Sequence, residues 1–214
     1  MITTPASSLS DAVAQLHDGE IHVWCLDYHR AQGRSPLLGI LAAYLRMDAT
    51  DVMLLEGPHG RPQLAPSLDS SLGFNWSHSG DKALVAVARG ITPGVDLEQQ
   101  RPRPKALAIA QRFFRREEAA ALAQLEGDAR GLAFLELWTA KEAVTKALGR
   151  GIGFGLDRLS FSGAGGCLQL QQLDGEDIGD WQLRRLAPAP GLVGALAWRG
   201  TAREVRLGVL ASGV

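Results

Sequence analysis

Residues 84–98, LVAVARGITPGVDLE, decide how the middle of this chain folds. The two ends of the stretch, residues 84–88 and 94–98, have the composition of short strands. Residues 89–93, between them, include Gly and Pro, which favour turns. We therefore expect an antiparallel hairpin, in which Glu98 returns beside the loop that precedes the first strand.

Asp96 and Glu98 are two residues apart, so in a strand they share one face while Val95 and Leu97 point to the core. Two carboxylates this close repel each other unless one is protonated, both stay hydrated or a cation lies between them. Magnesium suits such oxygen ligands, since proteins bind it through one or two carboxylates together with phosphate oxygens. A solvent-facing acidic edge strand has the same pattern, and the spacing alone leaves both interpretations open.

Two further polar clusters flank this stretch. Residues 75–81, NWSHSGD, combine hydroxyls, an imidazole and a glycine in an expected loop, and a plain polar turn has the same composition. Residues 138–146, WTAKEAVTK, belong to a predicted helix in which Glu142 and Lys146 share a face. An ordinary surface ion pair, worth about 0.3–0.5 kcal/mol, explains that spacing as well.

The rest of the chain predicts mixed strand and helix. Helices are expected where apolar residues recur three and four apart, at residues 35–46, 105–114, 117–125 and 129–148. Strands are expected at residues 21–27 and, as an antiparallel meander, within 159–210. Pro102 and Pro104 mark the best boundary between two halves.

Bulk properties argue against several classes of protein. A net charge of −1 provides no overall basic field for nucleic acid. Cys25 and Cys167 have neither the number nor the spacing of a disulfide framework or a C-x-x-C metal site. The N-terminal residues lack a signal-peptide pattern, and no apolar run approaches the ~18 residues of a membrane span. We expect a cytoplasmic globular protein that binds neither nucleic acid nor membranes.

In combination and in order, these motifs resemble the 4′-phosphopantetheinyl transferases, in particular the longer branch typified by the enzyme that activates surfactin synthetase. The matching segments are GPHGRP at 57–62, FNWSHS at 74–79, GVDLE at 94–98, RFF at 112–114 with Glu117 and Glu118, and WTAKEAVTKALG at 138–149. The resemblance runs from residue 21 to residue 155.

The resemblance implies a more definite fold than periodicity does. It implies an α+β protein with two similar subdomains related by a pseudo-twofold axis, each an antiparallel sheet packed with helices. Residues 1–103 would form the half with the phosphate-binding loop and the acidic strand, and residues 104–214 the half with the 138–146 helix and the meander. The active site would lie in the cleft between them, and the protein would be a monomer.

By motif match, the resemblance also implies a magnesium ion, or manganese, held by Asp96, Glu98 and Glu142. Glu142 would take the proton of an attacking serine, directly or through a metal-bound water. Lys146 would reach the pyrophosphate and stabilise the leaving phosphate. Asp96, Glu142 and Lys146 are therefore the expected catalytic residues. Lys141 lies about 100° away around the helix and would serve elsewhere.

Coenzyme A contacts carry over in the same way. Ser77 and His78 match residues that contact the coenzyme's phosphates, with His78 near the adenosine 3′-phosphate. Arg61 replaces the family's usual lysine near the adenine nucleotide, and its guanidinium fork suits phosphate at least as well. Arg34, with Arg30, is the candidate for the basic residues that the family often carries early in its first helix.

The implied activity is transfer of the phosphopantetheine arm of coenzyme A to a serine of an apo acyl-carrier or peptidyl-carrier protein, with release of 3′,5′-ADP. Two alternatives remain open: a non-catalytic relative that binds coenzyme A or a carrier, and an unrelated magnesium-dependent phosphotransferase. The intact acids at Asp96, Glu98 and Glu142 argue against the non-catalytic relative, and an unrelated phosphotransferase would have no use for the His78 loop.

A carrier is usually acidic and helical, so a basic helix face is a candidate docking surface. Arg112, Arg115 and Arg116 lie at helical spacing, although a solvated face would have the same pattern. Phe113 and Phe114 offer apolar surface beside them, and at least one is expected in the core.

The predicted helix at 138–146 should pack the indole of Trp138. We therefore expect Trp138→Ala to lower the melting temperature more than it lowers any catalytic rate. Thermal unfolding checks this, and an unchanged melting temperature would contradict it.

Overall fold

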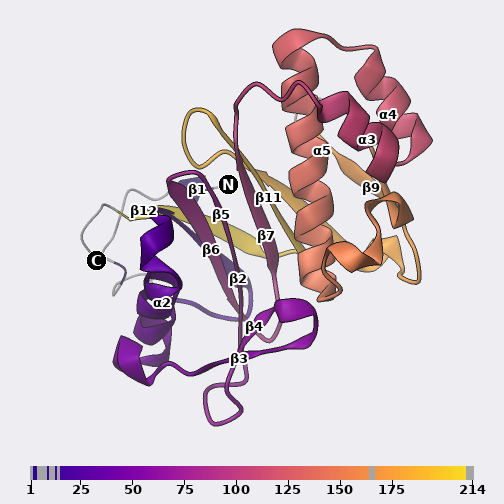
Figure 1. Ribbon diagram of the computed structural model, residues 1–214. Helices are drawn as coiled ribbons and strands as arrows, with labels where there is room; N and C mark the ends of the chain where they lie inside the picture. The colour runs from indigo at the N-terminus through magenta and orange to yellow at the C-terminus, as the bar shows by residue number, and fades with distance from the viewer. Residues whose placement is uncertain (1, 4–8, 10–12, 14, 164–166, 211–214) are drawn as a thin grey trace.

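The computed structural model describes residues 2–3, 9, 13, 15–163 and 167–210, which form an α+β protein (Figure 1). The expected fold class is confirmed. Two packed sheets lie between α2 (Ser35–Leu45) on one side and α5 (Gly127–Leu148) on the other (Figure 1). Among the described residues, no helix combines the length and the apolar character that crossing a membrane requires.

The larger sheet has five strands and takes most of them from the first half of the chain. Its order is β1 (Ile2–Thr3), β12 (Glu204–Leu210), β2 (Glu20–Asp27), β6 (Lys82–Arg89) and β5 (Leu72–Ser79). β2, β6 and β5 are antiparallel, whereas β12 runs parallel to β2. α2 packs on one face of this sheet through buried residues such as Leu37 and Leu41.

The smaller sheet has three strands, in the order β10 (Trp181–Leu186), β11 (Leu192–Arg199) and β7 (Gly94–Gln99). α5 lies on it, flanked by α3 (Ala106–Phe113) and α4 (Arg116–Ala123). Two hairpins complete the sheets, β3 (Leu54–Glu56) with β4 (Pro62–Leu64) and β8 (Leu159–Ser162) with β9 (Gln169–Leu173). Short 3₁₀ turns lie at Arg30–Gln32, Ala49–Asp51, Pro58–Gly60, Ile152–Phe154, Leu156–Arg158 and Ile178–Asp180.

The predicted hairpin between residues 84–88 and 94–98 is wrong. Both faces of β6 are apolar, and β6 is buried between β2 and β5, so its hairpin partner is β5. The predicted loop at 75–81 is accordingly mostly strand, since β5 extends to Ser79. β7 is a strand of the smaller sheet, where it pairs with β11.

Each half of the chain contributes a strand to the sheet formed mainly by the other half. β7 belongs to the first half but pairs with β11, while β12 leaves the expected C-terminal meander for the larger sheet. Leu97 of β7 and Trp198 of β11 pack with Leu84 of β6 in one core between the sheets. The boundary at Pro102–Pro104 stays a prediction, and strand pairing crosses it in both directions.

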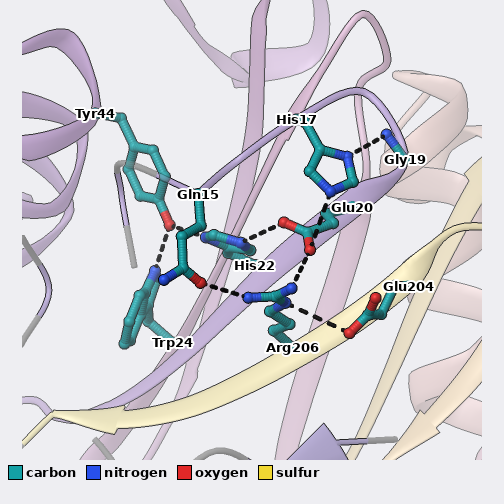
Figure 2. Close-up of polar contacts among 9 residues, drawn as sticks. All are labelled: Gln15, His17, Gly19, Glu20, His22, Trp24, Tyr44, Glu204 and Arg206. Carbon is teal, nitrogen blue, oxygen red and sulfur yellow. Dashed lines mark hydrogen bonds and ion pairs between the residues drawn. The ribbon is translucent and has the colours of Figure 1, made fainter. Parts of the chain in front are cut away.

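A buried polar network fixes β12 and α2 to β2 (Figure 2). Trp24 Nε1 donates to the Tyr44 hydroxyl (2.8 Å), so that hydroxyl can donate to His22 Nδ1 (2.7 Å). His22 Nε2 then donates to the fully buried Glu20 (3.2 Å), which is also paired with Arg206 of β12 (2.5 Å). Burial lowers the pKa of His22, which favours the neutral ring that this hydrogen-bond pattern requires.

Tyr44→Phe should destabilise the protein by about 2 kcal/mol or more, because it leaves Trp24 Nε1 and His22 Nδ1 buried without a partner. Urea unfolding measures the change. Tyr28→Phe is the matched control, since the Tyr28 hydroxyl makes no hydrogen bond with the described residues and should cost under ~0.5 kcal/mol. Equal losses in the two variants would contradict the network's importance.

Candidate functional site

Side-chain hydrogen bonds join β5 to β7 at every second residue of β5. Asn75 Oδ1 accepts from the Val95 amide (3.0 Å), Ser77 Oγ donates to Asp96 (2.7 Å), and Ser79 Oγ donates to Glu98 (3.0 Å). The two strands therefore run side by side in the same direction, although β7 pairs its backbone with β11. Glu98 therefore lies beside Ser79, within the segment where the sequence analysis expected it, although the hairpin that led to this expectation is wrong.

A glycine lets α5 lie directly on β7. A Cβ atom at Gly94 would lie 2.0 Å from the Ala143 carbonyl oxygen and 2.4 Å from the Ala147 amide, so only glycine fits there. This close approach brings Lys146 to the strand, where its Nζ donates to the Val95 carbonyl (3.0 Å) and to Asp96 (2.8 Å). Two of the predicted catalytic residues, Asp96 and Lys146, are therefore in direct contact.

Asp96 is 5% exposed, and its two oxygens differ. Oδ1 accepts from both Ser77 and Lys146, whereas Oδ2 is buried and has no hydrogen-bond partner among the residues that the structure describes. A buried carboxylate oxygen without a donor is costly, so this atom points to a ligand.

Glu142 lies one helical turn before Lys146, and its Oε1 is also buried without a partner in the described part of the chain. Burial, and then the negative charge of Asp96, raise the pKa of Glu142 to about 7. Lys146 opposes this shift and Glu98 adds to it. The three predicted metal ligands thus act on one another electrostatically.

Glu98 is held by two donors. Its Oε2 accepts from Ser79 and from Arg103 Nη2 (2.5 Å), a residue of the segment between β7 and α3. The sequence analysis missed Arg103, because its position five residues beyond Glu98 belongs to no motif. Ser79 could have been found, since it continues the alternation of Asn75 and Ser77.

Within the part of the chain that the structure describes, no three His, Cys, Asp or Glu side chains are arranged to hold a metal ion. The donor chemistry nevertheless fits a hard divalent cation, because Asp96 Oδ2 and Glu142 Oε1 are unpartnered carboxylate oxygens in one electrostatically coupled cluster. A metal at Asp96, Glu98 and Glu142 therefore stays a prediction that the donor set supports.

His78 lies at the exposed end of β5, with its ring stacked on Tyr28 at a centroid distance of 4.6 Å. Partial burial, and then the charges of Lys146 and Arg30, lower the pKa of His78. The cations around this ring suit an anionic group such as a phosphate. Its neighbour Ser77 points to the other face of the strand and donates to Asp96.

Arg61 binds the main chain. Its Nη1 donates to the Lys146 carbonyl (2.7 Å), and its Nη2 donates to the Phe74 and Pro93 carbonyls (both 3.3 Å). These bonds join the end of α5 to β5 and to the turn before β7. Contact of Arg61 with a nucleotide stays a prediction. So does that of Arg34, which is exposed just before α2 and shares no bond with this cluster among the described residues.

Lys141 serves elsewhere, as expected. It is fully buried, pairs with Glu118 of α4 (2.8 Å) and donates to the Leu156 and Leu159 carbonyls (2.9 and 2.7 Å). The pair holds α4 and the segment before β8 against α5, so this lysine of the 138–146 motif has a structural role.

The predicted docking face is only partly open. Arg115 lies 3.7 Å from Asp174 in an ion pair, while Arg112 stacks over the Phe113 ring. Phe113 is 44% exposed and Phe114 is buried, so one of the two phenylalanines is in the core, as expected. Docking at this face stays a prediction.

These features define an α+β protein whose coupled acids and cations form a site suited to a phosphorylated ligand. A family model described as the 4′-phosphopantetheinyl transferase superfamily matches residues 92–197. This range contains Asp96, Glu98, Glu142 and Lys146. The chain belongs to the 4′-phosphopantetheinyl transferase superfamily.

Individual relatives agree with the family match. The chain is 39% identical over 120 residues to a putative 4′-phosphopantetheinyl transferase of Synechocystis sp., covering 56% of this chain and 49% of that protein. It is 36% identical over 155 residues to the 4′-phosphopantetheinyl transferase HetI of Nostoc sp. (69% and 65%), and 29% identical over 139 residues to Sfp of Bacillus subtilis (62% and 60%). The chain thus spans about half to two thirds of the curated relatives it matches.

The contribution of Glu142 to the stability of the metal-free protein should fall as the pH rises from 5 to 8. The folded state raises the pKa of Glu142 from 4.5 to about 7, so its stabilising proton is fully bound at low pH and lost as the pH passes 7. Glu142→Gln removes this loss, which makes the variant about 3 kcal/mol more stable at pH 8 and about 1 kcal/mol more stable at pH 5.

Urea unfolding in EDTA at both pH values measures the difference. Glu136→Gln is the control, because Glu136 is a buried acid of the same helix that pairs with Arg185 (3.0 Å). That variant should shift both values without altering their difference. The same pH dependence in wild type and Glu142→Gln would show that Glu142 does not titrate in this range.

Proposed function

We propose that this protein transfers the 4′-phosphopantetheine arm of coenzyme A to a serine of an apo carrier protein and releases 3′,5′-ADP. The observation that carries the proposal is the contact between Lys146 and Asp96 beside the partnerless oxygen of Glu142. These residues come from two motifs about fifty positions apart, and both lie within the segment that matches the superfamily model.

The reaction exchanges one bond at phosphorus for another. The serine oxygen bonds to the β-phosphorus of coenzyme A, and the bond from that phosphorus to the bridging oxygen breaks. The electron pair stays on the 5′-phosphate of the leaving 3′,5′-ADP. Such transfers depend mainly on positioning and on neutralising charge.

Lys146 supplies positive charge where the leaving phosphate gains negative charge. Its ammonium donates to the Val95 carbonyl and to Asp96, so the side chain is already oriented when the substrate binds. Arg61, through the Lys146 carbonyl, positions the backbone of that residue.

Glu142 is the best candidate to accept the serine proton. Its pKa of about 7 places it near neutral pH, where a general base works most efficiently. A carboxylate has two oxygens, so Glu142 could bind a metal through one and accept the proton through the other, directly or through a water.

The charges around His78 support binding of the adenosine 3′-phosphate at the exposed end of β5. His78 lies close enough to Lys146 and Arg30 for their charges to lower its pKa, and a phosphate placed among the three would offset that repulsion. A bound phosphate should therefore raise the proton affinity of His78.

A magnesium ion, or manganese, would be held by Asp96, Glu98 and Glu142, and would act there as a Lewis acid on the pyrophosphate oxygens. The unpartnered oxygens of Asp96 and Glu142 support this assignment. The remaining expectations of the sequence analysis, namely an acyl or peptidyl carrier, the longer branch of the family, a monomer and a cytoplasmic location, are also proposals.

Incubation with coenzyme A, magnesium and a panel of apo acyl-carrier and peptidyl-carrier proteins tests the activity. The carrier should gain the mass of one phosphopantetheine arm. No gain on any carrier would favour a non-catalytic relative that only binds coenzyme A. Tighter binding of 3′,5′-ADP than of 5′-ADP would support the role given to His78, and equal binding would argue against it.

Asp96→Ala should lower the rate of transfer by about 100-fold or more while the protein stays folded, because Lys146 loses the carboxylate that orients it. Glu142→Ala should do the same. The mass assay, with circular dichroism of each variant, measures both effects. Near-normal turnover by either variant would remove that residue from the site. Glu136→Ala, an acid on the same helix, is the comparison that should keep its activity.

A further inference from the structure

The acids of β7 are each paired with a cation from a different part of the chain. Asp96 pairs with Lys146 of α5 (2.8 Å), and Glu98 pairs with Arg103 (2.5 Å). Glu142 forms no such ion pair with the described residues, and burial raises its pKa. The protein therefore balances the charge of both strand carboxylates with its own side chains.

Several features of Arg103 would allow it to exchange its ion pair with Glu98 for another partner. It belongs to the segment between β7 and α3 and is about one third exposed. Among the described residues its hydrogen bond is to Glu98, and its Nε is buried without a partner. A guanidinium has five N–H donors, so most of the binding capacity of Arg103 is unused in this state.

A divalent cation and Arg103 would compete for the same carboxylate. Glu98 Oε2 already accepts from both Arg103 and Ser79, and the positive charge of the arginine beside this carboxylate would repel a cation that binds to it. A phosphorylated ligand would change the balance, because a guanidinium binds phosphate through two parallel hydrogen bonds. Anion binding would release Glu98 for the metal.

We propose that Arg103 is a positioning residue that holds Glu98 in the free protein and transfers to a phosphate of the substrate, so that metal and substrate bind cooperatively. This rests on the proposed function, in which a diphosphate and a metal share the site. Binding of the two is then coupled by the same factor in either order.

The first experiment measures Mn²⁺ binding to the free protein, with unbound Mn²⁺ read from its electron paramagnetic resonance signal. Arg103→Gln should bind Mn²⁺ about fivefold more tightly than wild type, the size expected for loss of a partly exposed ion pair. Arg103→Lys keeps the charge and should resemble wild type. Arg101→Gln, an exposed arginine two residues earlier, controls for the general loss of positive charge.

The second experiment repeats the titration with saturating coenzyme A and no carrier, so that no transfer takes place. Coenzyme A should tighten Mn²⁺ binding in wild type, and about fivefold less in Arg103→Gln. Unchanged Mn²⁺ affinity in free Arg103→Gln, or equal gains in Arg103→Gln and Arg101→Gln, would overturn the inference. Failure of the carrier assay together with a tighter Arg103→Gln site would count against the proposed function and leave the role of Arg103 at Glu98 standing.

Discussion

The close contact between α5 and β7 at Gly94 is the constraint on which the site depends. A side chain at this position would overlap the backbone of α5, so the helix can lie on the strand only because the residue is glycine. The contact sets Glu142 and Lys146 above Asp96, although about fifty residues separate the helix motif from the strand motif. The arrangement of the site residues therefore depends first on how the backbones of α5 and β7 pack.

The polar residues of β5 form hydrogen bonds with β7 and fix its position from the side away from α5. Asn75, Ser77 and Ser79 each donate to or accept from β7, and they replace the backbone ladder that β5 and β7 lack. Asp96 and Glu98 thus have fixed positions in a largely buried place where two carboxylates would otherwise repel each other. Lys146 and Arg103 reduce that repulsion in the free protein. Burial, and then the charge of Asp96, raise the pKa of Glu142 to about 7.

Local pattern predicted which side chains share a face better than it predicted which strands pair. The alternation of Asp96 and Glu98, and the four-residue spacing of Glu142 and Lys146, each fix a shared face, and both were correct. The hairpin was wrong because a short turn between two strands does not exclude other partners, and the apolar faces of β6 are better buried between β2 and β5. Arg103 was not predicted because it belongs to no motif, and the carbonyl contacts of Arg61 could not be predicted because they depend on how distant segments pack.

The parallel pairing of β12 with β2 has a consequence for how the molecule is made. During synthesis, β2 emerges well before its neighbour on one side, residues 204–210, because more than 170 residues separate the two strands. Until then, one edge of β2, with Glu20 and its network to Arg206, lacks its partner. The larger sheet therefore closes only after residues 204–210 have been made, and a long-range pairing of this kind slows folding and leaves an open edge exposed to association with other chains.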